Sequence, residues 1–175
     1  FAKATGVASI ITRTDGTPIT SPSCFCKLCF SIIRKTKKGL ENCYHSDAVI
    51  GRYNPDGPIV RRCLSGGLWD AGASITVGGR HVANWLIGQV RDESQTEDQM
   101  LAYAREIGAD PDALIEAFRE VPTMSRTQFE LVAQALFALA NLLSTTAYQN
   151  IQQARFIAER DRAERERSRL QEELR

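Results

Sequence analysis

The chain has 175 residues, a formal net charge of +1 and a composition that is 43% hydrophobic. Such a length and apolar content predict one globular domain with a further segment attached. The balanced charge offers no general attraction for nucleic acid, and no run of apolar residues approaches the roughly 20 needed to span a bilayer. We therefore expect a cytoplasmic piece of a longer protein, without direct nucleic-acid contact and without membrane contact.

The first part of the chain predicts a β-hairpin followed by helices. In residues 7–20, a β-branched apolar stretch precedes the turn dipeptide Asp15-Gly16, and a second extended stretch follows it. Residues 26–34 carry apolar side chains at helical spacing, and Gly39 is expected to end that helix. A further short helix is expected at residues 41–49.

A second hairpin is predicted in the middle of the chain. Within residues 68–77, apolar residues alternate with polar ones, which is the period of a strand. Gly78-Gly79 turns the chain, and residues 81–90 supply a second strand with apolar positions for burial.

The following residues predict helices. Thr96 can cap a first helix, Asp110-Pro111 begins a second, and Ser125 caps a third. Apolar residues at spacings of three and four continue to Leu143, so one face of the third helix is expected to pack on a core. Together with the hairpins, this order of elements predicts an α+β fold with a small antiparallel sheet and flanking helices.

The end of the chain has a different pattern. Beyond about Gln149 the sequence is rich in both acids and bases, and Phe156, Ala163 and Leu170 repeat at heptad spacing. The simpler interpretation is a solvated single helix. We favour a coiled-coil signalling helix that forms a homodimer and leads to an output module. The predicted organisation is a domain at 1–145 and a helical linker at 146–175.

Three phrases in chain order resemble the PocR-type sensory domain. They are FCKLCFSIIRKTKKGLENCYHSD, RRCLSGGLWDAGASITVGG and VANWLIGQV, and with its flanks the resemblance covers about residues 1–143. The opening, FAKATGVASIITRTDGTPIT, resembles the first strands of a PAS-like sensor. The positions that match recurring residues of the family are Cys29, Cys43, Ser46, Asp47, Cys63, Gly67, Leu68, Asp70, Gly88 and Gln89.

This resemblance implies a PAS-like fold variant with a long C-terminal signalling helix and a sensory, non-enzymatic role in prokaryotic signal transduction. Domains of the family precede histidine kinases, diguanylate cyclases or transcription-regulator modules. The implied ligands are small organic compounds such as short diols and simple hydrocarbon derivatives. A dimerisation scaffold without any ligand is the plainer alternative.

A sensor of this kind needs a mostly apolar cavity with a few placed polar groups. The second hairpin provides the candidates: Asp70 and Gln89 to hydrogen-bond a hydroxyl, and Trp69, Ile75 and Trp85 to wall the cavity. Each of them is also a common core or strand-end residue. No nucleophile elbow, phosphate-binding loop or dinucleotide fingerprint accompanies them, so no catalytic residues are expected.

The five cysteines suggest a metal site. Cys26 and Cys29 have the spacing of a zinc knuckle, and Cys43 and Cys63 complete a set of four thiolates. An iron–sulfur cluster would use the same thiolates. The second pair is separated by far more than two residues, so the pattern is not specific for either.

Other interpretations of these residues stay open. Basic residues beside Cys29 and Cys63 favour the thiolate form. They therefore indicate a redox sensor in which the cysteines are the detector. Cysteine is also commonly buried as a small apolar residue. His45 and His81 are alternative metal ligands, and Cys24 is the thiol that the four-thiolate set leaves out.

Overall fold

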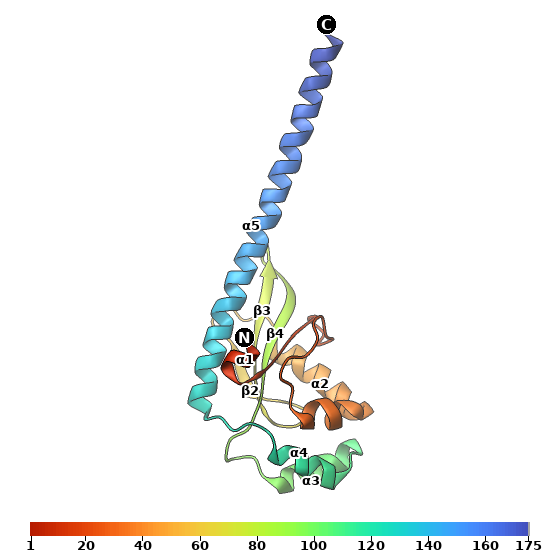
Figure 1. The fold of residues 1–175 in the computed structure, drawn as a ribbon, viewed down its shortest axis with the longest axis vertical. Coiled ribbons are helices and arrows are strands. Elements are labelled where there is room, and N and C mark those ends of the chain that lie inside the picture. Colours follow the sequence, from red (N-terminus) through yellow and green to blue (C-terminus); the bar gives the residue numbers. More distant parts are fainter. Residues whose placement is uncertain (175) are drawn as a thin grey trace.

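The computed structural model describes residues 1–174. The four strands form one antiparallel sheet in the order β1-β4-β3-β2, with helices around it (Figure 1). The predicted α+β, PAS-like fold with a long C-terminal helix is confirmed. In chain order the elements are α1 (Ala2–Thr5), β1 (Ala8–Thr12), the π-helical turn η1 (Leu28–Ile32), the 3₁₀ turn η2 (Ile33–Lys35), α2 (Lys37–Ile50), β2 (Ile59–Arg62), β3 (Trp69–Val77), β4 (Arg80–Val90), α3 (Glu97–Ile107), α4 (Pro111–Arg119) and α5 (Arg126–Glu173).

The two faces of the sheet pack against different elements. On one face, α5 places Phe129 and Leu136 against the side chains of β3 that run from Trp69 to Ile75. On the other face, Ile50 at the end of α2 packs against the sheet. Helices α3 and α4 pack on each other and against η1, at the end of the sheet away from the tip of α5 (Figure 1). The sheet therefore separates two packing layers.

Helices α2 to α5 each begin at a side-chain cap. The oxygen atoms of Thr36, Thr96, Asp110 and Ser125 accept hydrogen bonds from backbone amides in the first turns of α2, α3, α4 and α5, respectively. These bonds satisfy donors that a helix leaves without partners at its N-terminus. The predicted starts of α3, α4 and α5 are confirmed, as is the β3–β4 hairpin that turns at Gly78-Gly79.

The prediction for the N-terminal part is confirmed only in part. The chain folds back after Asp15-Gly16, with a bridge between Thr12 and Pro18 and a hydrogen bond from the Ile19 amide to the Ile11 carbonyl, but residues 17–20 do not form a strand. The pairing that runs along the whole of β1 is the one with β4. Gly39 does not end a helix, because it is the third residue of α2 and its amide donates to Thr36. The predicted helix at 26–34 is divided into η1 and η2, and strand β2 was not predicted.

Helix α5 has 48 residues, and its last buried residue is Ser144. Beyond that point it extends away from the other elements (Figure 1). The predicted division between residues 145 and 146 falls inside this continuous helix. One 18-residue stretch of α5 is apolar enough to cross a membrane by length and composition alone, and 22% of it is buried here. The expected lack of membrane contact stays a prediction.

Candidate functional site

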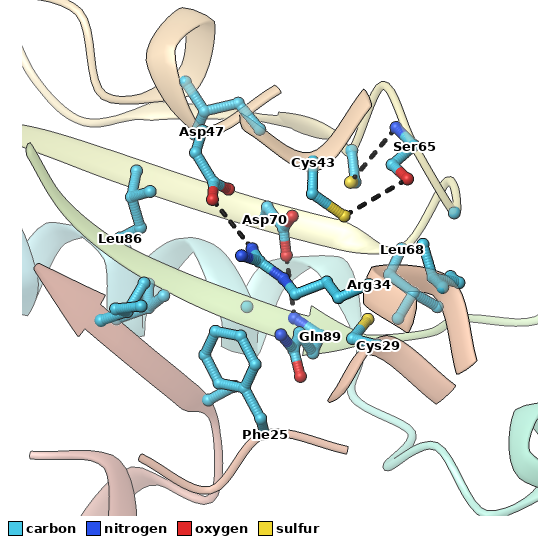
Figure 2. Close-up of a pocket in the computed structure, with 18 of the residues that line it drawn as sticks. Phe25, Cys29, Arg34, Cys43, Asp47, Ser65, Leu68, Asp70, Leu86 and Gln89 are labelled. Atoms are coloured by element: carbon cyan, nitrogen blue, oxygen red, sulfur yellow. Dashed lines mark hydrogen bonds and ion pairs between the residues drawn. The ribbon is translucent and has the colours of Figure 1, made fainter. Parts of the chain in front are cut away.

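A cavity of about 30 Å³ lies between the sheet and the elements opposite α5 (Figure 2). A volume of this size holds one or two water-sized groups. Most of its lining is apolar, and the polar side chains gather on a few positions. The lining residues are Ala8, Ser9, Ile10, Phe25, Cys29, Ile33, Arg34, Cys43, Asp47, Ile50, Cys63, Ser65, Gly66, Leu68, Asp70, Leu86, Ile87, Gly88 and Gln89.

An ion pair between η2 and α2 closes one side of the cavity. An Nη atom of Arg34 lies 2.8 Å from Oδ2 of Asp47, and both side chains are largely buried. Burial raises the pKa of Asp47, and the facing guanidinium opposes that shift. The Nε atom of Arg34 is buried without a hydrogen-bond partner among the described residues. Arg34 therefore has a donor left for a group inside the protein.

Asp70 faces the cavity from β3. Its Oδ1 accepts a hydrogen bond of 2.9 Å from the backbone amide of Gln89. Burial is the main cause that raises the pKa of Asp70 to about 7, although the bond from Gln89 favours the charged form. Asp70 keeps some accessible surface because the cavity itself admits water-sized groups. Its carboxyl group can thus accept or donate a hydrogen bond near neutral pH.

A β-bulge turns Gln89 toward the same space. The strand register shifts between Trp69 and Asp70, and Gln89 has a left-handed backbone with φ of 62°. Gly88 beside it has φ of 154°, and a Cβ atom there would lie 1.9 Å from Oδ1 of Asp70. Only glycine allows the Asp70 carboxylate to approach the strand this closely.

Three of the cysteines predicted as metal ligands reach the cavity, namely Cys29, Cys43 and Cys63. The Cys43 thiol donates to Ser65 Oγ at 3.4 Å, and Ser46 Oγ donates to Cys63 Sγ at 3.5 Å. Burial raises the pKa of both thiols, so the neutral form is favoured.

Cys26 lies at the margin of the cavity rather than in its lining. It packs against the buried cluster that contains Cys29, and interaction between the two thiols lowers the pKa of Cys26 and raises that of Cys29. In the described part of the chain, no three Cys, His, Asp or Glu side chains form a group that could hold a metal ion. The four-thiolate site therefore stays a prediction.

The structure divides the residues predicted to bind a ligand. Asp70 and Gln89 line the cavity. Trp69, Ile75 and Trp85 do not, because they lie on the face of the sheet that packs against α5. Successive side chains of a strand point to opposite faces, so the neighbours of Asp70 in β3 point away from it. The expectation that the two tryptophans wall the same cavity as Asp70 is not met.

Sequence reasoning about the pocket missed Arg34, Phe25 and Ser65. Phe25 lies in the loop before η1, Arg34 in η2 and Ser65 in the turn between β2 and β3, so no shared spacing connects them. Arg34 belongs to a basic run that was considered only as a neighbour of Cys29. Its position between two aspartates depends on the packing of η2 against the sheet, which local sequence does not encode.

Comparison with known proteins adds one finding. The family model described as "Sensory domain found in PocR" matches residues 1–148. The match includes every lining residue of the cavity and the part of α5 that packs on the sheet. No curated protein and no solved structure matches the chain.

Proposed function

Because the chain belongs to the family of sensory domains found in PocR, we propose that it is the ligand-binding domain of a prokaryotic signal-transduction protein. In this proposal it binds a small organic molecule and relays binding through a dimeric C-terminal helix. The output module would be a histidine kinase, a diguanylate cyclase or a transcription regulator.

The cavity carries the proposal for ligand binding. Its apolar wall includes Ile10, Phe25 and Leu86, and its polar groups gather at Arg34 and Asp70. An apolar wall with a few convergent polar groups is typical of small-molecule sites. The free Nε donor of Arg34 and the carboxyl of Asp70 would together suit a ligand with a hydroxyl or carbonyl group. Because the cavity of about 30 Å³ holds only one or two water-sized groups, it would have to widen to admit even a short diol.

A binding role fits these groups better than a catalytic one. The thiols of Cys43 and Cys63 are held neutral by burial, and neither His45 nor His81 lines the cavity. A neutral thiol is a weak nucleophile, and Asp70, a carboxyl group of the same lining, itself stays protonated up to about pH 7. We therefore assign the cavity to recognition.

The two faces of β3 would connect the ligand to α5. Asp70 faces the cavity, and Trp69 beside it lies in the cluster that contains Phe129 of α5. The guanidinium of Arg126, the first residue of α5, lies 5.3 Å from the centre of the Trp69 ring. A change of the β3 backbone at Asp70 would thus move Trp69 and alter its contacts with the start of the signalling helix.

Apolar side chains on the outer face of α5 support the homodimer. Leu131 is 68% exposed and Leu142 is 63% exposed, although both lie within the segment that packs on the sheet. They face away from the buried residues Phe129 and Leu136. Exposed apolar surface of this kind is a common feature of interaction sites.

Calorimetric titration with ethane-1,2-diol, propane-1,2-diol and butane-2,3-diol tests the proposal. We expect one of them to bind, and we expect Leu86→Phe to remove binding because the larger ring fills the cavity. Leu131→Phe makes the same change on the exposed face of α5 and should leave binding intact. The proposal fails if none binds, or if Leu86→Phe has no effect on a diol that does.

A further inference from the structure

A pair of thiols at the margin of the cavity suggests chemistry that ligand binding does not use. Cys26 and Cys29 lie in one helical turn, where the amide of Phe30 donates to the carbonyl of Cys26 at 3.0 Å. Cys26 packs against the buried cluster that contains Cys29. Cys26 is half-buried and open to solvent, whereas Cys29 is buried and lines the cavity.

The other three cysteines lack this arrangement. Cys43 and Cys63 each have a serine as hydrogen-bond partner, Ser65 and Ser46, respectively. Cys24 is exposed in the loop before η1. The Cys-x-x-Cys pair alone combines a thiol that solvent can reach with a second thiol on the same helical turn.

The local backbone suits closure of a disulfide. Cβ atoms three residues apart in a helix are about 5–6 Å apart, and a disulfide needs about 4 Å. Closure therefore takes a contraction of about 1–2 Å within one turn. Cys26 precedes the short π-helical turn η1 and is not part of a long regular helix that would resist this change.

We propose that Cys26 and Cys29 form a reversible disulfide by exchange with a small-molecule disulfide such as oxidised glutathione. The accessible Cys26 sulfur attacks one sulfur of the small molecule, which breaks its S–S bond and releases one thiol. The Cys29 sulfur then attacks Cys26, forms the internal disulfide and releases the second thiol. Two protein thiols lose two electrons and two protons, and the small disulfide gains them as two thiols. Excess glutathione reverses both steps.

The same contraction would alter the polar end of the cavity. The backbone amide of Cys26 donates to Oε1 of Gln89 at 2.8 Å, and the amide of Gln89 donates to Asp70 at 2.9 Å. Movement of Cys29 toward Cys26 also withdraws a side chain from the cavity lining. The redox state of the pair is therefore linked to the position of Gln89. This inference does not depend on which ligand the cavity binds.

Peptide mapping tests the disulfide directly. The full chain is equilibrated with mixtures of reduced and oxidised glutathione, acid-quenched, alkylated and digested with trypsin. Cleavage after Lys27 places the two thiols in separate peptides, 14–27 and 28–34, which only a disulfide holds together. We expect this linked pair to appear as the oxidised fraction rises and to disappear on reduction.

Two serine variants identify which cysteine of peptide 14–27 is linked to Cys29. Cys24 shares peptide 14–27 with Cys26, so Cys24→Ser must retain the linked pair and Cys26→Ser must lose it. The proposal is overturned if both thiols stay alkylated in oxidised glutathione, or if Cys26→Ser still yields the linked peptides. Hydrogen exchange at the Gln89 amide gives a second measurement. Equal exchange in the oxidised and reduced chains would refute the link to the cavity.

Discussion

Asp70 and Trp69 are adjacent in β3, but their side chains lie on opposite faces of the sheet. The Asp70 carboxylate accepts a hydrogen bond from Gln89 at the cavity, whereas the Trp69 indole lies in the cluster that includes α5. Two further contacts hold the indole in place: its Nε1 donates to Asp92, and the Arg62 guanidinium lies 4.4 Å from its ring centre. One peptide unit thus joins the candidate ligand site to the helix that leaves the domain.

The raised pKa of Asp70 predicts a specific dependence of stability on pH. The folded-state pKa is about 7, compared with 3.8 for an unperturbed carboxyl. Between these values the folded chain holds a proton that the unfolded chain has lost. The contribution of Asp70 to the free energy of unfolding is therefore greatest below about pH 4 and falls until about pH 7. Its upper limit is on the order of 4 kcal/mol, and water in the cavity reduces it.

Chemical denaturation of the wild type and Asp70→Asn between pH 5 and pH 8 measures this effect. The free energy of unfolding of Asp70→Asn should fall less than that of the wild type as the pH rises toward 7. The difference in stability between the two should therefore shift in favour of the variant. Asp56→Asn, in the exposed loop before β2, serves as the control and should follow the wild type. Parallel curves for the wild type and Asp70→Asn would show that Asp70 titrates normally.

Gly88→Ala is expected to be among the most damaging small substitutions in the sheet. The added Cβ would lie 1.9 Å from Oδ1 of Asp70 and 2.6 Å from the carbonyl oxygen of Trp69. The second neighbour is backbone and cannot rotate away, so the loss of stability should exceed about 3 kcal/mol. Gly57→Ala is the matched control, because no atom lies within 4 Å of its new Cβ. Similar melting temperatures for the two variants would contradict the close packing at Gly88.

Local sequence patterns predicted the helix starts because the relevant interactions are local. Thr96, Asp110 and Ser125 each cap a helix through bonds to residues that follow closely in sequence. The pairing of β1 with β4 was missed for the opposite reason. Residues 8–12 pair with residues 84–88, and no nearby residue indicates so distant a contact.

The site was predicted in part for similar physical reasons. Alternation along β3 could have separated Asp70 from Trp69 and Ile75, since residues an odd number of positions apart face opposite sides of a regular strand. Gln89 reaches the cavity because it is the extra residue of a bulge, and its φ of 62° has no sequence signature in a non-glycine residue. Arg34 depends on how η2 packs, so its role could be found only from the structure.

The four-thiolate hypothesis predicts about one zinc ion per chain in protein prepared without chelator. Binding would have to draw Cys26 toward Cys29, Cys43 and Cys63, and break the hydrogen bonds to Ser65 and Ser46. Metal analysis with native mass spectrometry measures the stoichiometry, and an absorption band in the visible range would indicate iron–sulfur instead. Cys63→Ser should lose the ion and Cys24→Ser should keep it. Folded, metal-free protein would reject the hypothesis.

Two leucines of α5 allow its two faces to be compared by the same substitution. Leu136 is fully buried against the sheet, whereas Leu142 is 63% exposed. Leu136→Ala should lower the free energy of unfolding by about 2–5 kcal/mol, because it leaves a cavity in the core. Leu142→Ala should cost less than about 0.5 kcal/mol when the chain is dilute enough to be monomeric.

The proposed dimer predicts that Leu142→Ala has its main effect on association rather than on the stability of the monomer. Sedimentation equilibrium should show a weaker dimer for Leu142→Ala, because its side chain would be buried between two copies of α5. Arg126→Ala, an exposed change at the start of the same helix, serves as a control for altered charge and helix content. If the wild type is monomeric at all concentrations, or if Leu142→Ala associates as strongly as the wild type, the outer face of α5 does not form the dimer. Since association stabilises the folded chain by mass action, the melting temperature of the wild type should also rise with protein concentration, and that of Leu142→Ala should rise less.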